Sequence, residues 1–433
     1  MKKIVNKIIA IAILGVAITA CKIEPIPDPN NLSVADDPSM QQLELYAVGI
    51  EDLMRTEMGF YYDVTSIIGR EQYFFTNSDP RYTGELLGKG DATLDPAGFY
   101  GTRPYAARYK VVKNANLLLE GVEKTSVALT DAERNAFSGY AKTAEAYSLL
   151  LALNLQYKNG IRVDVSDIAN LGEFLDYKPA LAAISSILNE GFTELGNGGS
   201  EFPFALSSSF AGFDTPSEFA TFNRAIAARV ALYDERYSDI PSLLNSSFMD
   251  MTGDLDNGPA HFYSTAGTDK PNAVYRVPDQ SEALLAHPSY TVDIMAVDNR
   301  MNKVALRTNT AVLDGLSSDY DVVILSSLAS SMPIIRNEEL ILMMAEARLE
   351  GGDLPGAISA LDIIRTAHGL AAYGGTVDAA SVKTELIYNR RYSLFGEGHR
   401  WVDMRRWGLE QTLPTDRAGD DVWVQMPRPV SEN

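Results

Sequence analysis

The segment from Arg336 to Gly408 constrains the fold more than any other part of the chain. Its first half predicts two antiparallel helices, because apolar residues recur at helical spacing on both sides of the turn Gly351-Gly352-Asp353. Small residues stand where two such helices would cross closely, as in tetratricopeptide-type pairs: Ala347, Gly352 and Ala357. The second half ends in EGHRWVDMRRWG, which interleaves arginine with tryptophan. We therefore expect a helical hairpin followed by a segment that combines charge with aromatic surface.

Helical periodicity also extends upstream of this segment. Residues 105–122 and 130–155 predict one pair of helices, and a capping box at Thr130-Asp131-Ala132-Glu133 opens the second of them. Residues 177–195 and 217–237 predict another pair. The sequence thus predicts a mostly α protein in which helical pairs form the scaffold.

The N-terminus carries an export signal. Three lysines precede the apolar stretch Ile8–Ile18, which is shorter than the roughly 20 residues that span a bilayer. The sequence Ile18-Thr19-Ala20-Cys21 then resembles a bacterial lipobox, and Cys21 is the only cysteine of the chain. Lipidation explains a lone exported cysteine better than a disulfide does. We therefore expect residues 1–20 to be a lipoprotein signal peptide and residues 21–45 to be a lipid anchor with a flexible tether.

Composition limits both the partners and the size of the core. The formal net charge is −20 at pH 7, and removal of the signal segment makes it more negative. Such a charge repels phosphate backbones, which excludes nucleic acid as a partner. With 46% hydrophobic and 22% charged residues, the chain can bury a sizeable core. No long linker interrupts it, and we expect residues 46–433 to form a single domain.

Patterns typical of catalysis or metal binding are sparse. The sequence contains no HExxH, G-x-S-x-G, Walker-type or GxGxxG motif, and its four histidines are scattered. The segment Asp250–Gly258 is rich in side-chain oxygen but misses the spacing of an EF-hand loop. The paired carboxylates of a glycoside hydrolase leave no sequence pattern, so such an activity stays an alternative. We expect a binding protein without catalysis, cofactor or metal.

The string RNEELILMMAEAR followed by EGHRWVDMRRWG resembles the closing segment of the SusD/RagB family of lipid-anchored nutrient-binding proteins. Three upstream residues stand at the spacing of that family's W-x3-Y-x6-N helix, with tyrosine in place of tryptophan: Tyr105, Tyr109 and Asn116. Asn389 and Ser393 stand where the family has acids, so the neighbouring arginines have fewer local partners. The resemblance implies a SusD-like fold in which Trp401 and Trp407 pack the helical array.

The resemblance also implies a function. SusD-like proteins are outer-membrane lipoproteins exposed at the cell surface, which capture an oligosaccharide and deliver it to a SusC-type TonB-dependent transporter. A peptide ligand is the first alternative, because RagB-like members suggest it. Less favoured alternatives are an exported glycoside hydrolase and a purely structural helical-repeat adaptor that binds no small ligand.

Two long stretches, Gly59–Tyr100 and Asp250–Val323, lack helical periodicity, and we expect them to be irregular. In the family such segments form the ligand-facing surface, so we expect them to meet on one side. A sugar ring has one apolar face and hydroxyl edges, which favours flat aromatic side chains beside arginine. Six residues of the two stretches are therefore predicted to bind the ligand: Tyr73, Arg81, Tyr82, Tyr263, Tyr275 and Tyr290.

Overall fold

The computed structural model describes residues 34–432, and the chain divides into two units, Met1–Asp36 and Asp37–Asn433. The predicted signal peptide and Cys21 lie outside the described residues. Helix α2 (Met40–Met54) begins within the stretch predicted as tether, so the predicted boundary at residue 45 is too late. Ser39 and Gln42 form a capping box that starts this helix, a signal that the proline-rich sequence before it obscures.

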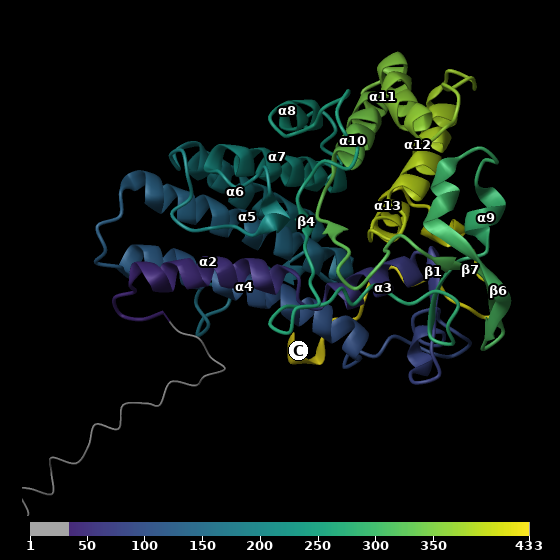
Figure 1. Ribbon diagram of the computed structural model, residues 1–433, viewed down its shortest axis with the longest axis horizontal. Coiled ribbons are helices and arrows are strands. Elements are labelled where there is room, and N and C mark those ends of the chain that lie inside the picture. The colour runs from purple at the N-terminus through teal and green to yellow at the C-terminus, as the bar shows by residue number, and fades with distance from the viewer. Residues whose placement is uncertain (1–33, 433) are drawn as a thin grey trace, which may run out of the picture. The chain divides into compact units, whose positions relative to one another are not determined.

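The second unit is mostly α, as predicted, and its helices pack side by side. Contacts run from α2 to α4, and from α4 through α5 and α6 to α7 (Figure 1). Short α8 follows α7 and lies against it. The bounds of these helices are α4 (Phe99–Lys124), α5 (Asp131–Gln156), α6 (Tyr177–Gly196), α7 (Pro216–Tyr233) and α8 (Ile240–Asn245).

Local sequence explains where the central helices begin. The predicted capping box opens α5, because the Thr130 hydroxyl accepts from the Glu133 amide and the Glu133 carboxylate accepts from the Thr130 amide. Thr215 caps α7 through its hydroxyl, which accepts from the Glu218 amide, and Pro216 stands in the first turn. The alanine-rich face of α7 is buried, which lets its neighbours approach closely.

A second group of helices forms the C-terminal scaffold. It comprises α10 (Asn337–Glu350), α11 (Leu354–Ala367), α12 (Ala379–Ser393) and α13 (Arg400–Arg406). The predicted hairpin is confirmed as α10 and α11, and α12 packs on both. These three helices enclose a small apolar core of their own, separate from the main one. Trp401 is fully buried and its indole donates to the Trp423 carbonyl at 2.7 Å, while Trp407 is only partly buried.

Three arginines of the C-terminal scaffold, Arg390, Arg391 and Arg406, have acidic partners despite Asn389 and Ser393, so the expected shortage of partners is wrong for them. Arg400 and Arg405 have no carboxylate within ion-pair distance among residues 34–432, and Arg405 donates to the carbonyls of Val424 and Asn154 instead. Arg406 pairs with Glu346 of α10, which also accepts from the Trp407 indole at 2.8 Å. The remaining pairs join Arg390 to Asp403 and Arg391 to Asp293. Arg406 also pairs with Asp403 within α13, but the other pairs join different helices, and spacing along the sequence does not reveal them.

The two stretches that were predicted to be irregular contain regular structure. The first holds α3 (Met58–Ile68) and β1 (Gln72–Phe75). The second holds β5 (Ala283–Ala286), short α9 (Ser289–Asp293), β6 (Val304–Leu313) and β7 (Leu316–Val322). β1 and β5 are buried on both faces, so they lack the alternation that reveals a strand.

These strands join the two stretches in one antiparallel sheet of order β1-β5-β7-β6 (Figure 1). Tyr73 of β1 lies opposite Leu285 of β5. Two minor ribbons pair β2 (Ile161–Arg162) with β3 (Phe174–Leu175), and β4 (Ala260–His261) with β8 (Met332–Pro333). Among residues 34–432, no helix has the length and apolar character needed to cross a membrane.

Candidate ligand-binding site

A cavity of about 380 Å³ lies between the end of α2, the first turns of α3 and the loop that follows β4. We call it the aromatic cavity. Both predicted ligand-facing stretches contribute to its lining, the first through α3 and the second through residues 263–276. Its volume falls within the range of small-molecule sites. The lining residues that matter below are Arg55, Phe60, Asp63, Tyr263, Lys270 and Arg276.

The shape of the aromatic cavity depends on a close approach between α3 and the loop. A Cβ atom on Gly59 would come within 2.9 Å of the Ala273 Cβ atom, so only glycine fits there without a shift. Glu57, just before α3, adopts a left-handed backbone conformation with φ of 57°. Glu57 stands in the short turn between α2 and α3. The local backbone thus presents the first turn of α3 to the cavity.

Aromatic side chains form a row that starts at the cavity. Phe60 lines the cavity and is half-buried, and its ring meets the edge of Phe99 at a centroid distance of 5.1 Å. The row continues from Phe99 to Tyr82 at 5.9 Å, and from Tyr82 to Phe74 at 4.7 Å. Phe60 and Phe99 retain exposed surface, whereas Tyr82 and Phe74 are buried.

Three guanidinium groups lie over rings of this row: Arg103 over Phe60 at 5.3 Å, Arg81 over Phe99 at 4.4 Å, and Arg276 over Phe74 at 4.8 Å. The stacking holds each group flat against a ring while leaving edge N–H donors for other acceptors. Arg81 is the most constrained, because two of its nitrogens also bind Asp79 at 2.9 and 2.7 Å. The surface therefore alternates apolar faces with hydrogen-bond donors.

Asp63 is the unusual polar group of the aromatic cavity. Its side chain is 2% exposed, and within residues 34–432 its Oδ1 atom has no hydrogen-bond partner. The Arg276 guanidinium lies 3.6 Å from Oδ2. Burial raises the pKa of Asp63 to about 6, and the attraction of Arg276 opposes that rise only in part. A buried carboxylate oxygen without a donor is costly, and a ligand hydroxyl would supply the donor.

Two cations in the lining of the aromatic cavity are paired. Arg55 binds Asp269 at 2.9 Å and also donates to the Phe262 carbonyl at 2.7 Å. Lys270 binds Asp52 at 2.5 Å. Two buried atoms of this lining have no hydrogen-bond partner within residues 34–432, the donor Nε of Arg55 and the acceptor Oδ1 of Asp63. Asp63 therefore supplies the open acceptor of the cavity.

Three of the six predicted ligand residues belong to this site. Tyr263 lines the cavity, Arg81 stacks on Phe99, and Tyr82 lies in the aromatic row. Tyr82 and Tyr263 are buried, so they form its walls and do not offer an open ring face. Tyr275 is half-buried beside Arg276 and does not line the cavity.

Tyr73 and Tyr290 lie in the core, away from the aromatic cavity, and a role as exposed stacking platforms does not fit them. Tyr73 is 1% exposed, and its hydroxyl donates to Asp416. Tyr290 is 2% exposed, and its hydroxyl donates to the Arg300 carbonyl at 2.7 Å. Both satisfy a polar tip within the protein, as buried tyrosines usually do. The pattern of polar and apolar residues in the sequence does not distinguish such buried tyrosines from exposed ones.

Sequence reasoning missed Phe60 and Asp63. Phe60 begins the run Phe60-Tyr61-Tyr62, and only the two tyrosines of that run are buried. Helix α3 is apolar on nearly every side, so periodicity does not show which side faces the cavity. Asp63 within this apolar run was the available signal, because a lone acid in a buried helix requires a reason.

The described residues contain no group of histidine, cysteine, aspartate or glutamate side chains arranged to hold a metal ion. The aromatic cavity and the adjoining aromatic row offer ring faces, guanidinium donors and two carboxylates, those of Asp63 and Glu57. This combination suits a neutral ligand with an apolar face and several hydroxyls.

Comparison with known proteins supports the family resemblance. The sequence model of the SusD family matches residues 325–426, which include the C-terminal scaffold. No curated protein shows significant sequence similarity to the chain. The resemblance to the SusD/RagB family is thus confirmed in the segment that first suggested it.

Solved structures extend the likeness to the whole fold. A SusD superfamily protein from Bacteroides vulgatus matches with a TM-score of 0.68 at 16% identity, covering 91% of this chain and 96% of its own. Surface glycan-binding protein A from Bacteroides thetaiotaomicron, in complex with laminarihexaose, matches with a TM-score of 0.67 at 13% identity. That match covers 90% of this chain and 97% of the other. The chain has the fold of SusD-like proteins.

Proposed function

We propose that this protein binds an oligosaccharide in the aromatic cavity and does not cleave it. The observation that carries the proposal is the unpartnered Oδ1 atom of Asp63, a residue that lines the same cavity as the half-buried Phe60. A sugar ring would stack on Phe60 and Phe99, donate a hydroxyl to Asp63 and accept from Arg103 or Arg276. The shared fold with a glycan-binding protein from Bacteroides thetaiotaomicron supports the same ligand class.

The affinity of such a site is expected to be moderate. Phe60 and Phe99 keep exposed surface, so a glycan bound on them would remain partly exposed to solvent. A dissociation constant between micromolar and millimolar corresponds to roughly −4 to −8 kcal/mol. This range allows the ligand to be released onward.

Calorimetric titration of the purified protein with laminarihexaose, cellohexaose and maltohexaose tests the proposal. At least one glycan should bind in this range, and Phe60→Ala should weaken it about tenfold, since it removes the stacking surface. Phe174→Ala is a matched control, because Arg162 and Arg428 stack on Phe174 at 4.3 and 3.9 Å outside the cavity. Equal losses in both variants, or release of shorter sugars from any of the glycans, would contradict the proposal.

A peptide ligand is the alternative that the family resemblance keeps open. The charged rim favours it less, because Arg55 and Lys270 already pair with acids and would not be free for a peptide carboxylate. Titration with a tetra-alanine peptide separates the two classes. Peptide binding that Phe60→Ala weakens, without any glycan binding, would replace the glycan proposal.

The anchor and the transporter belong to the same proposal. The lipobox-like sequence at Cys21 supports lipidation and an outer-membrane position at the cell surface, and the family resemblance supports delivery to a SusC-type TonB-dependent transporter. A Cys21→Ser variant should leave the membrane fraction or stay unprocessed. Co-purification of the tagged protein from native membranes should recover the transporter, and its consistent absence would argue against the partnership.

A further inference from the structure

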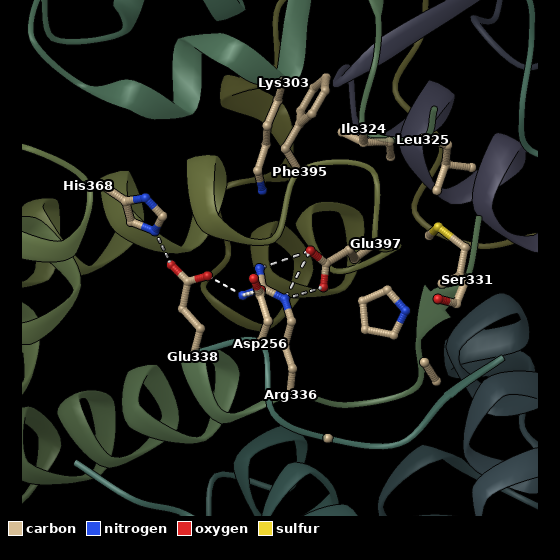
Figure 2. Close-up of a pocket in the computed structure, with 14 residues that line it drawn as sticks. Asp256, Lys303, Ile324, Leu325, Ser331, Arg336, Glu338, His368, Phe395 and Glu397 are labelled. Carbon is tan, nitrogen blue, oxygen red and sulfur yellow. Dashed lines mark hydrogen bonds and ion pairs between the residues drawn. The ribbon is translucent and has the colours of Figure 1, made fainter. Parts of the chain in front are cut away.

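A second and larger cavity, of about 470 Å³, lies at the N-terminal end of α10 (Figure 2). It shares no lining residue with the aromatic cavity. Its walls come from the loops around β4 and β8, the start of β6, the end of α11 and the turn after α12. We call it the Lys303 cavity, after the lysine that extends into it in Figure 2.

The arginine in this cavity is fully engaged by protein groups. Arg336 donates to Glu397 at 3.0 Å, to Glu338, and to the Ser393 carbonyl at 2.6 Å. Glu338 in turn accepts from His368 at 2.6 Å. Figure 2 shows this chain of contacts along one side of the cavity. Arg336 therefore fixes the shape of the wall and has little capacity left for a ligand.

Lys303 differs from Arg336 in this respect. Its ammonium donates to the Ser393 carbonyl at 2.5 Å, and no carboxylate of residues 34–432 lies within ion-pair distance of it. Burial lowers the pKa of Lys303, although Glu397 and Glu338 attract its proton. An ammonium group has three N–H donors, so two of them remain for a ligand in the cavity.

The charges of the lining define the ligand class. Three carboxylates, from Asp256, Glu338 and Glu397, outnumber the cations of Lys303 and Arg336, so an anionic ligand meets net repulsion. A simple cation would meet the ammonium of Lys303 instead. A hydroxyl group avoids both conflicts, because it accepts from Lys303 and donates to a carboxylate.

Part of the wall of the cavity is apolar. It consists of Phe395, Met332, Ile324 and Leu325, of which the last two are half-buried on the loop after β7. We propose that the Lys303 cavity is a second ligand site, which takes one or two units of a neutral polyhydroxylated ligand through hydrogen bonds to Lys303 and packing on this wall. The choice of a sugar as the source of the hydroxyls rests on the function proposed above.

Titration of the full-length protein with laminarihexaose, cellohexaose and maltohexaose, and with their disaccharides, tests the second site. Lys303→Met keeps the apolar stem and removes the donors, so it should weaken disaccharide binding at least tenfold. Leu325→Trp should have the same effect by filling the cavity from its loop side, which covers the case in which Lys303→Met fails to fold. Lys110→Met, on the exposed face of α4, controls for the loss of one positive charge.

The two sites are separated by pairing these variants with Phe60→Ala. Loss of one binding event in Lys303→Met and of another in Phe60→Ala supports two sites. Unchanged binding in both Lys303→Met and Leu325→Trp overturns the second site and leaves the aromatic cavity standing. Loss only in the Lys303 cavity variants would support the second site and overturn the aromatic cavity as the glycan site. If none of these glycans binds, both proposals fall.

Discussion

The C-terminal scaffold and the aromatic cavity both bury carboxylates, but they treat them in opposite ways. In the scaffold, Glu346 accepts from Arg406, Lys383 and Trp407, and it is fully buried. In the cavity, Asp63 is also buried, yet its Oδ1 atom has no partner in the described chain and its nearest cation is 3.6 Å from the other oxygen. Complete pairing fixes a fold, whereas incomplete pairing leaves room for a ligand.

The pKa directions of the two regions follow from this difference. Burial alone raises the pKa of Glu346, but attraction by Arg406 and Lys383 outweighs it, and the pKa lies far below its ordinary value. For Asp63 the same burial dominates and raises the pKa to about 6. The direction of the pKa shift of a buried carboxylate thus shows whether the surrounding groups stabilise its charge.

The largest expected effect is on the scaffold. Glu346→Gln removes the charge between Arg406 and Lys383 with little change in volume. It leaves the buried Arg406 and the half-buried Lys383 with less compensation. We expect the free energy of unfolding to fall by about 3–5 kcal/mol, as for other broken buried ion pairs.

Chemical denaturation measures this loss. Glu350→Gln is the matched control, because Glu350 pairs with the same Lys383 at 2.8 Å but lies nearer the surface. Its cost should stay below about 1 kcal/mol. Similar losses in the two variants would show that burial does not distinguish the scaffold pairs.

The sequence predicted the scaffold better than the ligand site for physical reasons. Helical periodicity and small residues mark α10 and α11, since packing of one helix on another leaves a repeating signal. Arg406 pairs locally with Asp403, but its second partner Glu346 lies on another helix and leaves no local signal. The same holds for Asp293, the partner of Arg391. Local spacing therefore does not indicate the ion pairs that the structure has at Arg390, Arg391 and Arg406.

The two stretches predicted to be irregular contain strands and ligand-site residues that sequence patterns do not reveal. They do meet, but through the pairing of β1 with β5 and through the lining of the aromatic cavity. Strands that are buried on both faces read as apolar sequence without alternation. Tyrosine occurs both in cores and on surfaces, so its presence does not indicate exposure. Tyr73 and Tyr290 were selected for residue type, whereas Phe60 and Asp63 acquire their role from burial and from missing partners. Only the structure supplies those two properties.

The second prediction concerns how the stability of the protein depends on pH through Asp63. The Asp63 carboxyl has an ordinary pKa of 3.8, which applies to the unfolded chain, and a pKa of about 6 in the fold. Because the folded state binds the proton more tightly, Asp63 lowers stability as the pH rises from about 4 to about 6. Asp63→Asn removes this penalty, so the variant should match the wild type below pH 4 and exceed it by about 3 kcal/mol above pH 6.

Urea denaturation across this pH range gives the difference in unfolding free energy between variant and wild type. Other carboxyls with raised pKa, such as those of Glu71 and Glu145, are present in both proteins and cancel in the difference. Asp91→Asn, at an exposed position, should give a difference that does not change with pH. A flat difference for Asp63→Asn would mean that its carboxylate is satisfied after all, and the contrast with Glu346 would disappear.

The smallest expected effect concerns Arg103, which lies over both exposed rings of the aromatic row, 5.3 Å from the Phe60 centroid and 5.8 Å from that of Phe99. Its side chain is exposed, so the stacking contributes about 0.5–1 kcal/mol. If the guanidinium donates to a sugar hydroxyl, Arg103→Ala should weaken glycan binding about two- to fivefold and leave stability unchanged. Calorimetry measures the change in affinity. Lys110→Ala is the control, because Lys110 is another exposed cation on the same helix. Tighter binding in Arg103→Ala would instead show that the guanidinium shields Phe60, and the open ring face assigned to the cavity would then exist only when Arg103 moves aside.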